Sequence, residues 1–181
     1  RDVERSRGLG DVYKRQSVVG VFETVVAVLP IVMCFQSLIL DMAGNVGTQS
    51  LAVTIRVLMD ESLTGKQKLQ LVFKEMRIGF CNGLLLGVLS FAVIGLFIFL
   101  FKGKTMMFAF SVSACIGIAL LLAMLISSAV GTCIPLFFKK IHIDPAVASG
   151  PLITTVNDLV AVVTFYGLSW LFLIEMLHLA G

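Results

Sequence analysis

Long apolar runs alternate with short charged segments along this chain. Three of these runs carry no charge or only one; they are residues 78–101, 105–138 and 145–174. A fourth, residues 24–55, is interrupted only by Asp41. Each run exceeds the roughly 20 residues that a helix needs to cross the hydrocarbon core of a bilayer. The pattern therefore predicts four complete membrane-spanning helices.

The same pattern sets the fold class. Backbone polar groups within lipid must find their partners inside the spanning structure, so only helices and closed barrels cross a membrane. A barrel strand alternates apolar and polar residues, and these runs are continuously apolar. Composition agrees, with 58% hydrophobic residues, 14% charged residues and a mean hydropathy of +1.01. We predict an all-α, polytopic membrane helix bundle, a multi-pass protein of the cell membrane.

The N-terminal segment differs from the rest. Residues 1–16 are polar, show no amphipathic period and lack the design of a signal peptide. Residues 11–16, DVYKRQ, read like a translated transposon-adapter sequence. We interpret residues 1–16 as a non-native leader and residues 17–181 as the transmembrane domain. Residues 17–23 then read as the end of a truncated first helix.

Asp158 is the only charge in its apolar run. A carboxylate at the centre of a membrane helix costs roughly 3 kcal/mol on insertion scales, and such groups usually mark an ion or substrate path. Thr154 and Thr155 lie one turn before it. Hydroxyl, carbonyl and carboxylate oxygens are the ligands that Mg²⁺ and Ca²⁺ prefer. The alternative is a carboxylate fixed by a neighbouring helix.

A polar stripe follows the run that contains Asp41. At helical spacing one face collects Asp41, Asn45, Thr48, Gln49, Ala52 and Arg56. Polar groups on one face of a membrane helix should not face lipid. The stripe predicts the lining of a pore or cavity, or else hydrogen bonds between helices. Gly44 and Gly47 allow close approach of another backbone.

Small residues predict where the helices pack. Gly79, Gly83 and Gly87 recur at every fourth position, and Ala123, Ser127 and Gly131 repeat the pattern in the next run. Pro151 predicts a kink or break in the last helix. The polar segment 60–77 predicts an amphipathic helix on the membrane surface.

Several functions are disfavoured. The net charge of +3 lies largely in residues 1–16, so no basic surface indicates nucleic acid. The four cysteines lie in apolar runs without a CxxC pair and read as free thiols. HExxH is absent, and His142 and His178 lie outside the centres of the runs, so we expect no enzyme. A proton- or sodium-coupled secondary cation carrier, with Asp158 as the coupling carboxylate, remains an alternative to a channel.

Basic residues set the orientation. Most of them lie in two connecting segments, which hold Arg56, Lys66, Lys68, Lys74, Arg77, Lys139 and Lys140, whereas the connection between them holds Lys102 and Lys104. We predict that the first two connections are cytoplasmic. Tyr166 and Trp170 are expected to anchor the last helix near the outer interface.

Two motifs carry a family resemblance. Residues 41–50, DMAGNVGTQS, followed by Arg56, resemble the GGNxGxQS signature of the MgtE magnesium transporter family. Residues 144–158, DPAVASGPLITTVND, resemble the family's DPAxxSGPxxTTxxD run before its last helix. The match covers residues 17 to about 178. Ala43 departs from the signature, where the family usually has its first glycine.

The resemblance implies a homodimeric Mg²⁺ channel of the bacterial cytoplasmic membrane with five helices per subunit. It implies that Asp158 binds hydrated Mg²⁺, the transported and bound ion, on the dimer axis, with the Thr154 carbonyl as a helper. The pore-lining positions are then Gly44, Asn45, Thr48 and Gly150, with Asp41 on the same stripe. The family's cytosolic N-terminal and CBS domains do not occur in this sequence, so we expect a truncated transmembrane domain.

Overall fold

The computed structural model describes residues 30–60 and 63–171, and this part of the chain consists of helices joined by short turns. Its elements are α3 (Pro30–Met33), α4 (Gln36–Asp60), α5 (Gly65–Phe101), α6 (Met106–Lys140) and α7 (Pro145–Ser169). The predicted leader and the predicted end of a first helix lie outside the described residues. The all-α prediction is confirmed for the described part.

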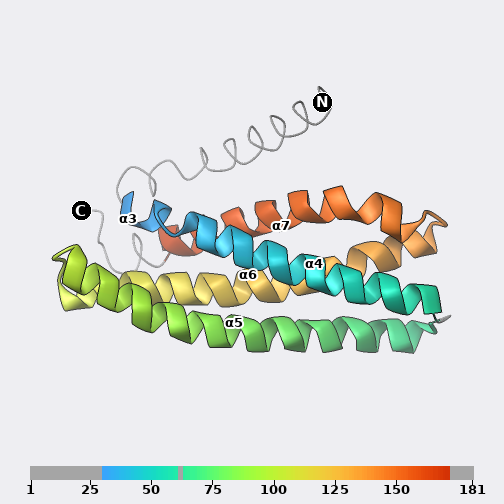
Figure 1. Cartoon of the computed structure of the whole chain (residues 1–181), viewed down its shortest axis with the longest axis horizontal. Coiled ribbons are helices and arrows are strands. Elements are labelled where there is room, and N and C mark those ends of the chain that lie inside the picture. The colour runs from blue at the N-terminus through green and yellow to red at the C-terminus, as the bar shows by residue number, and fades with distance from the viewer. Residues whose placement is uncertain (1–29, 61–62, 172–181) are drawn as a thin grey trace, which may run out of the picture.

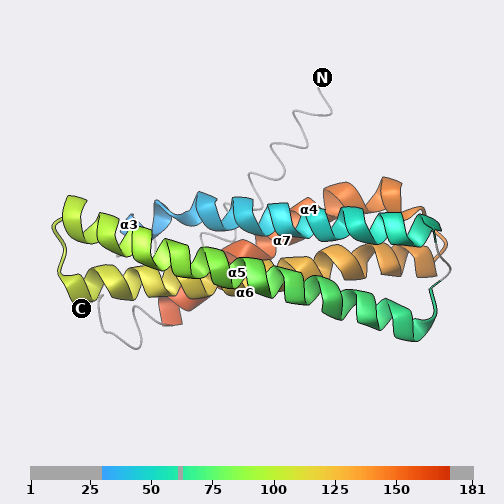
Figure 2. The same ribbon diagram turned by 60° about the horizontal axis from the view of Figure 1, so that its bottom comes forward.

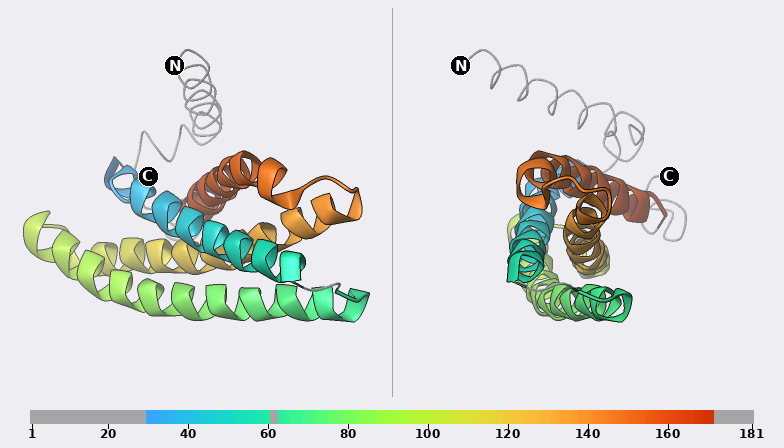
Figure 3. Two further views of the ribbon diagram at one scale, coloured as in Figure 1. Left: turned by 45° about the vertical axis from the view of Figure 1, so that its right-hand side comes forward. Right: turned by 90° about the vertical axis from the view of Figure 1, so that its right-hand side faces the viewer.

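The four long helices form one bundle in which neighbours in sequence run in opposite directions (Figure 1). Helix α6 packs against α4, α5 and α7, and α4 also packs against α7. Helices α5 and α7 lie on opposite sides of the bundle (Figures 1 and 3). The core is a cluster of aliphatic and aromatic side chains from α4, α6 and α7 with the end of α5. The arrangement is seen from a second side in Figure 2.

Three described helices are long and apolar enough to cross a membrane: Gly65–Phe101, Met106–Lys140 and Leu152–Ser169. Helix α4 has 25 residues, which is also enough length for a span. Its polar stripe lowers its hydropathy, so composition alone does not mark it as spanning. The structure thus supports three of the four predicted spans by length and composition.

The first predicted span has different bounds in the structure. Instead of one helix over residues 24–55, α3 ends at Met33, a turn covers Cys34 and Phe35, and α4 continues to Asp60. Pro30 is the first residue of α3, a position where the missing N–H costs nothing. Nothing in the structure explains why the turn falls at Cys34.

The helix predicted within residues 60–77 is confirmed from Gly65 onwards, but it is not a surface helix apart from the next span. Asp60 is the last residue of α4, and residues 65–77 form the first turns of α5, which continues without a break to Phe101 over 37 residues. Gly79 stands at this boundary, but it is buried against α6 inside the helix and does not end it, and no proline is present there. The start is fixed by a cap, in which Gln67 Oε1 accepts a hydrogen bond from the Thr64 backbone N–H at 2.8 Å.

The predicted small-residue faces are confirmed. Gly79, Gly83 and Gly87 are buried against α6. A Cβ placed on Gly87 would lie 2.9 Å from the Gly117 carbonyl oxygen, and one on Gly117 would lie 2.8 Å from that of Gly87. Glycine is therefore required at this crossing, where the two backbones touch.

Of the kink or break predicted at Pro151, the break is wrong, because α7 continues through it from Pro145 to Ser169, and the kink stays a prediction. A proline in the second turn removes a single backbone hydrogen bond, and the remaining bonds hold the helix together. The start of α7 is capped by Asp144, whose Oδ1 accepts from the Ala146 N–H at 2.9 Å.

Candidate cation pathway

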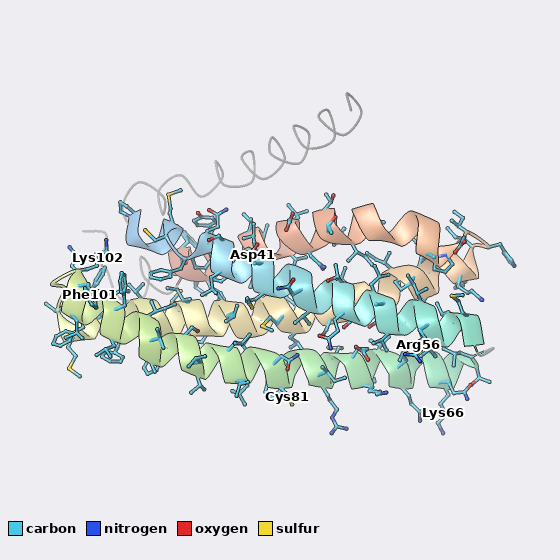
Figure 4. The ribbon with its side chains drawn as sticks, in the orientation of Figure 1. Asp41, Arg56, Lys66, Cys81, Phe101 and Lys102 are labelled. Carbon is cyan, nitrogen blue, oxygen red and sulfur yellow. The ribbon has the colours of Figure 1, made fainter. Side chains whose placement is uncertain are left out.

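The polar stripe of α4 lies on one exposed face of the helix, as predicted. Its six members, Asp41, Asn45, Thr48, Gln49, Ala52 and Arg56, are all exposed. The opposite face of α4 is buried in the core through Ile39, Ala43 and Val46. Asp41 and Arg56 mark the two ends of the stripe (Figure 4).

Two predicted ligands lie on α7. Asp158 is half-buried and Thr154, one turn earlier, is exposed. Asp158, Thr154 and Thr155 each interact with another group of the chain, so none of them is free. Gly150 lies in the second turn of α7, and its surroundings fall outside what the structure describes.

Two contacts fix the register between α4 and α7. The Tyr166 hydroxyl donates to Gln36 Oε1 at 2.7 Å. Further along, Gly47 is so close to Asn157 that a Cβ would fall on its amide group. The helices are antiparallel, so this register places Asn45 at the depth of Asp158. It also places Thr48 at the depth of Thr154.

The side chains at this depth are oxygen-rich. The Thr48 hydroxyl donates its proton within its own helix, to the carbonyl oxygens of Gly44 at 2.9 Å and Asn45 at 3.0 Å. Its lone pairs then remain available as acceptors on the exposed face. Among the described residues, no group of three or more histidine, cysteine, aspartate or glutamate side chains lies together. The described part of one chain thus offers no multi-carboxylate cage.

Sequence reasoning missed the junction that positions these helices. Gly47 of α4, Gly131 of α6 and Asn157 of α7 meet in the core, and a Cβ on Gly131 would collide with the Gly47 carbonyl. Asn157 has no exposed surface, and neither its Oδ1 nor its Nδ2 has a hydrogen-bond partner in the described structure. The small-residue pattern that includes Gly131 could be recognised in the sequence, but the sequence did not show which helix packs against it.

Two further contacts were not predicted. Lys139 Nζ donates to the Leu58 carbonyl oxygen at 3.0 Å and thereby ties the end of α4 to α6. Tyr166, predicted to anchor at the membrane interface, is instead fully buried and bonded to Gln36. A phenol in the core needs a hydrogen-bond partner, and α4 supplies it. The four cysteines are free, as predicted.

An apolar helix bundle with an oxygen-lined polar face defines a multi-pass membrane protein with a candidate path for a polar solute or ion. Comparison with known proteins narrows this class. A family model, MgtE, described as a divalent cation transporter, matches residues 36–168. The chain belongs to the MgtE family.

Three curated relatives share this similarity. Each is named "Magnesium transporter MgtE". The proteins of Bacillus subtilis and Enterococcus faecalis are both 32% identical over 157 residues. The protein of Thermus thermophilus is 27% identical over 157 residues. The match covers 87% of this chain and 33% of each relative, so the chain spans about a third of their length.

Proposed function

We propose that this chain forms the pore of a magnesium channel in the bacterial cytoplasmic membrane, with Asp158 as the central ligand of the ion. The observation that carries the proposal is the register between α4 and α7. It places Asn45 and Thr48 of α4 at the same depth in the bundle as Asp158 and Thr154 of α7. The family match and the names of the relatives support a divalent cation, and magnesium first.

The pore is proposed to lie on the two-fold axis of a homodimer. The stripe from Asp41 to Arg56 is exposed in the single chain, and lipid would leave its polar groups unsatisfied. A second copy related by a two-fold axis would cover the stripe with the same stripe, since such interfaces are self-complementary. Both stripes would then enclose water instead of facing hydrocarbon.

The ion is proposed to keep its water shell. A two-fold axis brings two Asp158 carboxylates towards each other, and their mutual repulsion is relieved when a divalent cation lies between them. Mg²⁺ dehydrates reluctantly and requires octahedral oxygen, which two carboxylates alone do not supply. Water bridging the ion to Asp158 and to the Thr154 carbonyl fulfils this requirement, with the carboxylates about 4 Å or more from the ion.

The test is Mg²⁺ flux into proteoliposomes that contain the full chain and an entrapped fluorescent Mg²⁺ indicator. Asp158→Asn, which keeps the shape and removes the charge, is expected to abolish the flux. Ser90→Ala, on α5 and away from the stripe, is the matched control and should conduct like the parent. Wild-type flux through Asp158→Asn, in protein that elutes normally from a sizing column, would refute the assignment.

The same assay separates a channel from the alternative, a proton- or sodium-coupled carrier. A channel is driven only by the Mg²⁺ gradient and the membrane potential. A carrier that couples through Asp158 would slow when the proton or sodium gradient is collapsed at constant potential. Flux that stops under this condition would favour the carrier.

The orientation is also part of the proposal. We infer that the connections α4–α5 and α6–α7 are cytoplasmic and that Lys104 lies outside. In a cysteine-free background, Lys104→Cys should react with an impermeant maleimide added to intact cells. Lys68→Cys should react only after lysis, and the reverse pattern would overturn the topology.

A further inference from the structure

Glu75 is a buried carboxylate that the proposed pathway does not use. It lies in α5 on the face that packs against α6 and is 1% exposed. Its Oε1 atom has no hydrogen-bond partner among the described residues. The neighbouring cations Lys74 and Arg77 are exposed on other faces of α5. A buried carboxylate without a partner is strongly unfavourable, so its surroundings need an explanation.

The register between α5 and α6 shows what lies near Glu75. Gly83 packs against Leu121, and a Cβ on Gly79 would lie 2.5 Å from Ser128 Oγ. One turn back along α5 corresponds to one turn forward along the antiparallel α6. Glu75 is therefore at a depth between Ser128 and Thr132, which are both fully buried. Side chains lean towards the N-terminus of their helix, which directs the carboxylate towards Thr132 and Pro135.

The hydroxyl groups at this depth are arranged as acceptors. Ser128 Oγ donates its proton to the Leu125 carbonyl at 2.8 Å, and Thr132 Oγ1 donates to the Ser128 carbonyl at 2.9 Å. Each hydroxyl has a single proton, so neither is left to donate to Glu75. Both hydroxyl oxygens can therefore act only as acceptors, and the nearby carboxylate also presents acceptor oxygens.

A break in the hydrogen bonding of α6 adds one more oxygen. Pro135 lies inside α6 and is buried. It has no N–H to give to the Gly131 carbonyl four residues earlier. Carbonyls released in this way are used by membrane proteins to hold small cations. The register of the two helices thus places the carboxylate, two hydroxyl oxygens and a released carbonyl at similar depth along the contact of α5 and α6.

This set of acceptors lacks a positive charge. We propose that Glu75, Ser128, Thr132 and the Gly131 carbonyl form a second cation site inside each subunit, which takes a monovalent ion of the size of Na⁺. One carboxylate among neutral oxygens balances a single positive charge, whereas a divalent ion would leave an uncompensated charge in a low-dielectric interior. The two carboxylates belong to different sites, because Glu75 is on α5 and Asp158 is on α7, and these helices lie on opposite sides of the bundle (Figure 3).

Thermal unfolding of the purified full chain, followed by circular dichroism, tests the site. NaCl is titrated against choline chloride at constant ionic strength and without Mg²⁺. A ligand that binds only the folded state raises the midpoint in a saturable manner. We expect this rise with Na⁺ and not with choline, and we expect Glu75→Gln to lose it. Asp158→Asn should keep it, which separates this site from the proposed pore.

Thr132→Val gives a second test if Glu75→Gln does not fold. This variant keeps the shape of the side chain and removes one ligand, so we expect the apparent affinity for Na⁺ to fall at least tenfold. Three results would overturn the proposal. The first is a rise of the unfolding midpoint that is equal with choline and with Na⁺. The second is a rise with Na⁺ that persists in Glu75→Gln, or that keeps its full affinity in Thr132→Val. The third is a Glu75-dependent change of the midpoint with Mg²⁺ or with pH, and none with Na⁺.

Discussion

The α5–α6 pair and the α4–α7 pair are built for different tasks. Helices α5 and α6 have 37 and 35 residues, and they touch backbone to backbone through Gly87 and Gly117. From Ile78 onwards the outward face of α5 is apolar, and Cys81 points away from the bundle on that side (Figure 4). Helices α4 and α7 are shorter, with 25 residues each, and they carry the exposed polar stripe and Asp158.

The difference is what we expect if, as proposed, α5 and α6 support the bundle and α4 and α7 line the ion path. The close contact makes α5 and α6 a rigid pair, since no side chains that could rearrange lie between the two backbones where they touch. We call this pair of helices the wall. The polar groups on α4 and α7 are held against that wall through α6. Changes in the wall should therefore cost stability, whereas changes on the exposed face of α4 should cost transport and leave stability alone.

The largest expected effect is on the junction between the two pairs. Gly131→Val would push its side chain into the Gly47 carbonyl. Overpacking against backbone costs about 3 kcal/mol or more because the backbone cannot move aside cheaply. We expect the variant to lose its monodisperse peak in fluorescence-detected size-exclusion chromatography. Gly44→Ala is the matched control, because a Cβ there meets nothing within 4 Å.

The next effect has the opposite sign. Asn157→Leu removes an amide whose donor and acceptor are both buried without partners. Leaving such groups unsatisfied costs about 1–3 kcal/mol, so the variant should unfold at a higher temperature than the parent. A lower midpoint would show that the folded protein supplies the amide with a partner, for example an internal water.

A smaller effect is expected where α4 and α7 are joined. Tyr166→Phe removes the hydrogen bond to Gln36. Hydrogen bonds between membrane helices average about 0.6 kcal/mol, so the loss should be of this order. Combining it with Gln36→Leu closes a double-mutant cycle, which reports the coupling between the two residues. Coupling energy indistinguishable from zero would show that the bond does not link the helices.

The last prediction concerns two substitutions that should hardly change stability but should differ in their effect on transport. Thr48 on α4 and Ser90 on α5 both donate to a carbonyl of their own helix, at 2.9 and 3.0 Å. Thr48 is exposed on the stripe and Ser90 is buried against α6. Thr48→Val and Ser90→Ala should each change stability by less than about 0.5 kcal/mol. Only Thr48→Val should slow Mg²⁺ flux in proteoliposomes, by severalfold, and equal fluxes would contradict the assignment of the stripe.

Hydrophobic patterning was sufficient to predict the helices and the faces on which they pack. The spacing of Gly79, Gly83 and Gly87 gave the contact surface of α5, and the spacing from Asp41 to Arg56 gave the exposed face of α4. Both predictions depend only on the period of one helix. The pore-lining role of these residues, and that of Asp158, stays a prediction.

Predictions that depended on the end of a helix were less successful. The polar turns before Ile78 suggested a surface helix apart from the next span, but a change from polar to apolar residues does not by itself end a helix, and α5 continues through it. Contacts between helices distant in sequence could not be derived at all. The meeting of Gly47, Gly131 and Asn157 depends on how three helices are arranged, and no single-helix period contains this information.

The unbroken course of α5 has a mechanical consequence. At 1.5 Å per residue its 37 residues span about 56 Å, nearly twice the thickness of the hydrocarbon core. Its first turns, from Lys66 to Arg77, continue the apolar segment as a stiff polar lever that lies beside the ends of α4 and α6 (Figure 1). A force applied at Lys66 cannot be absorbed by a hinge before Gly79. Tilting the lever must therefore tilt the wall to which the polar helices are fastened.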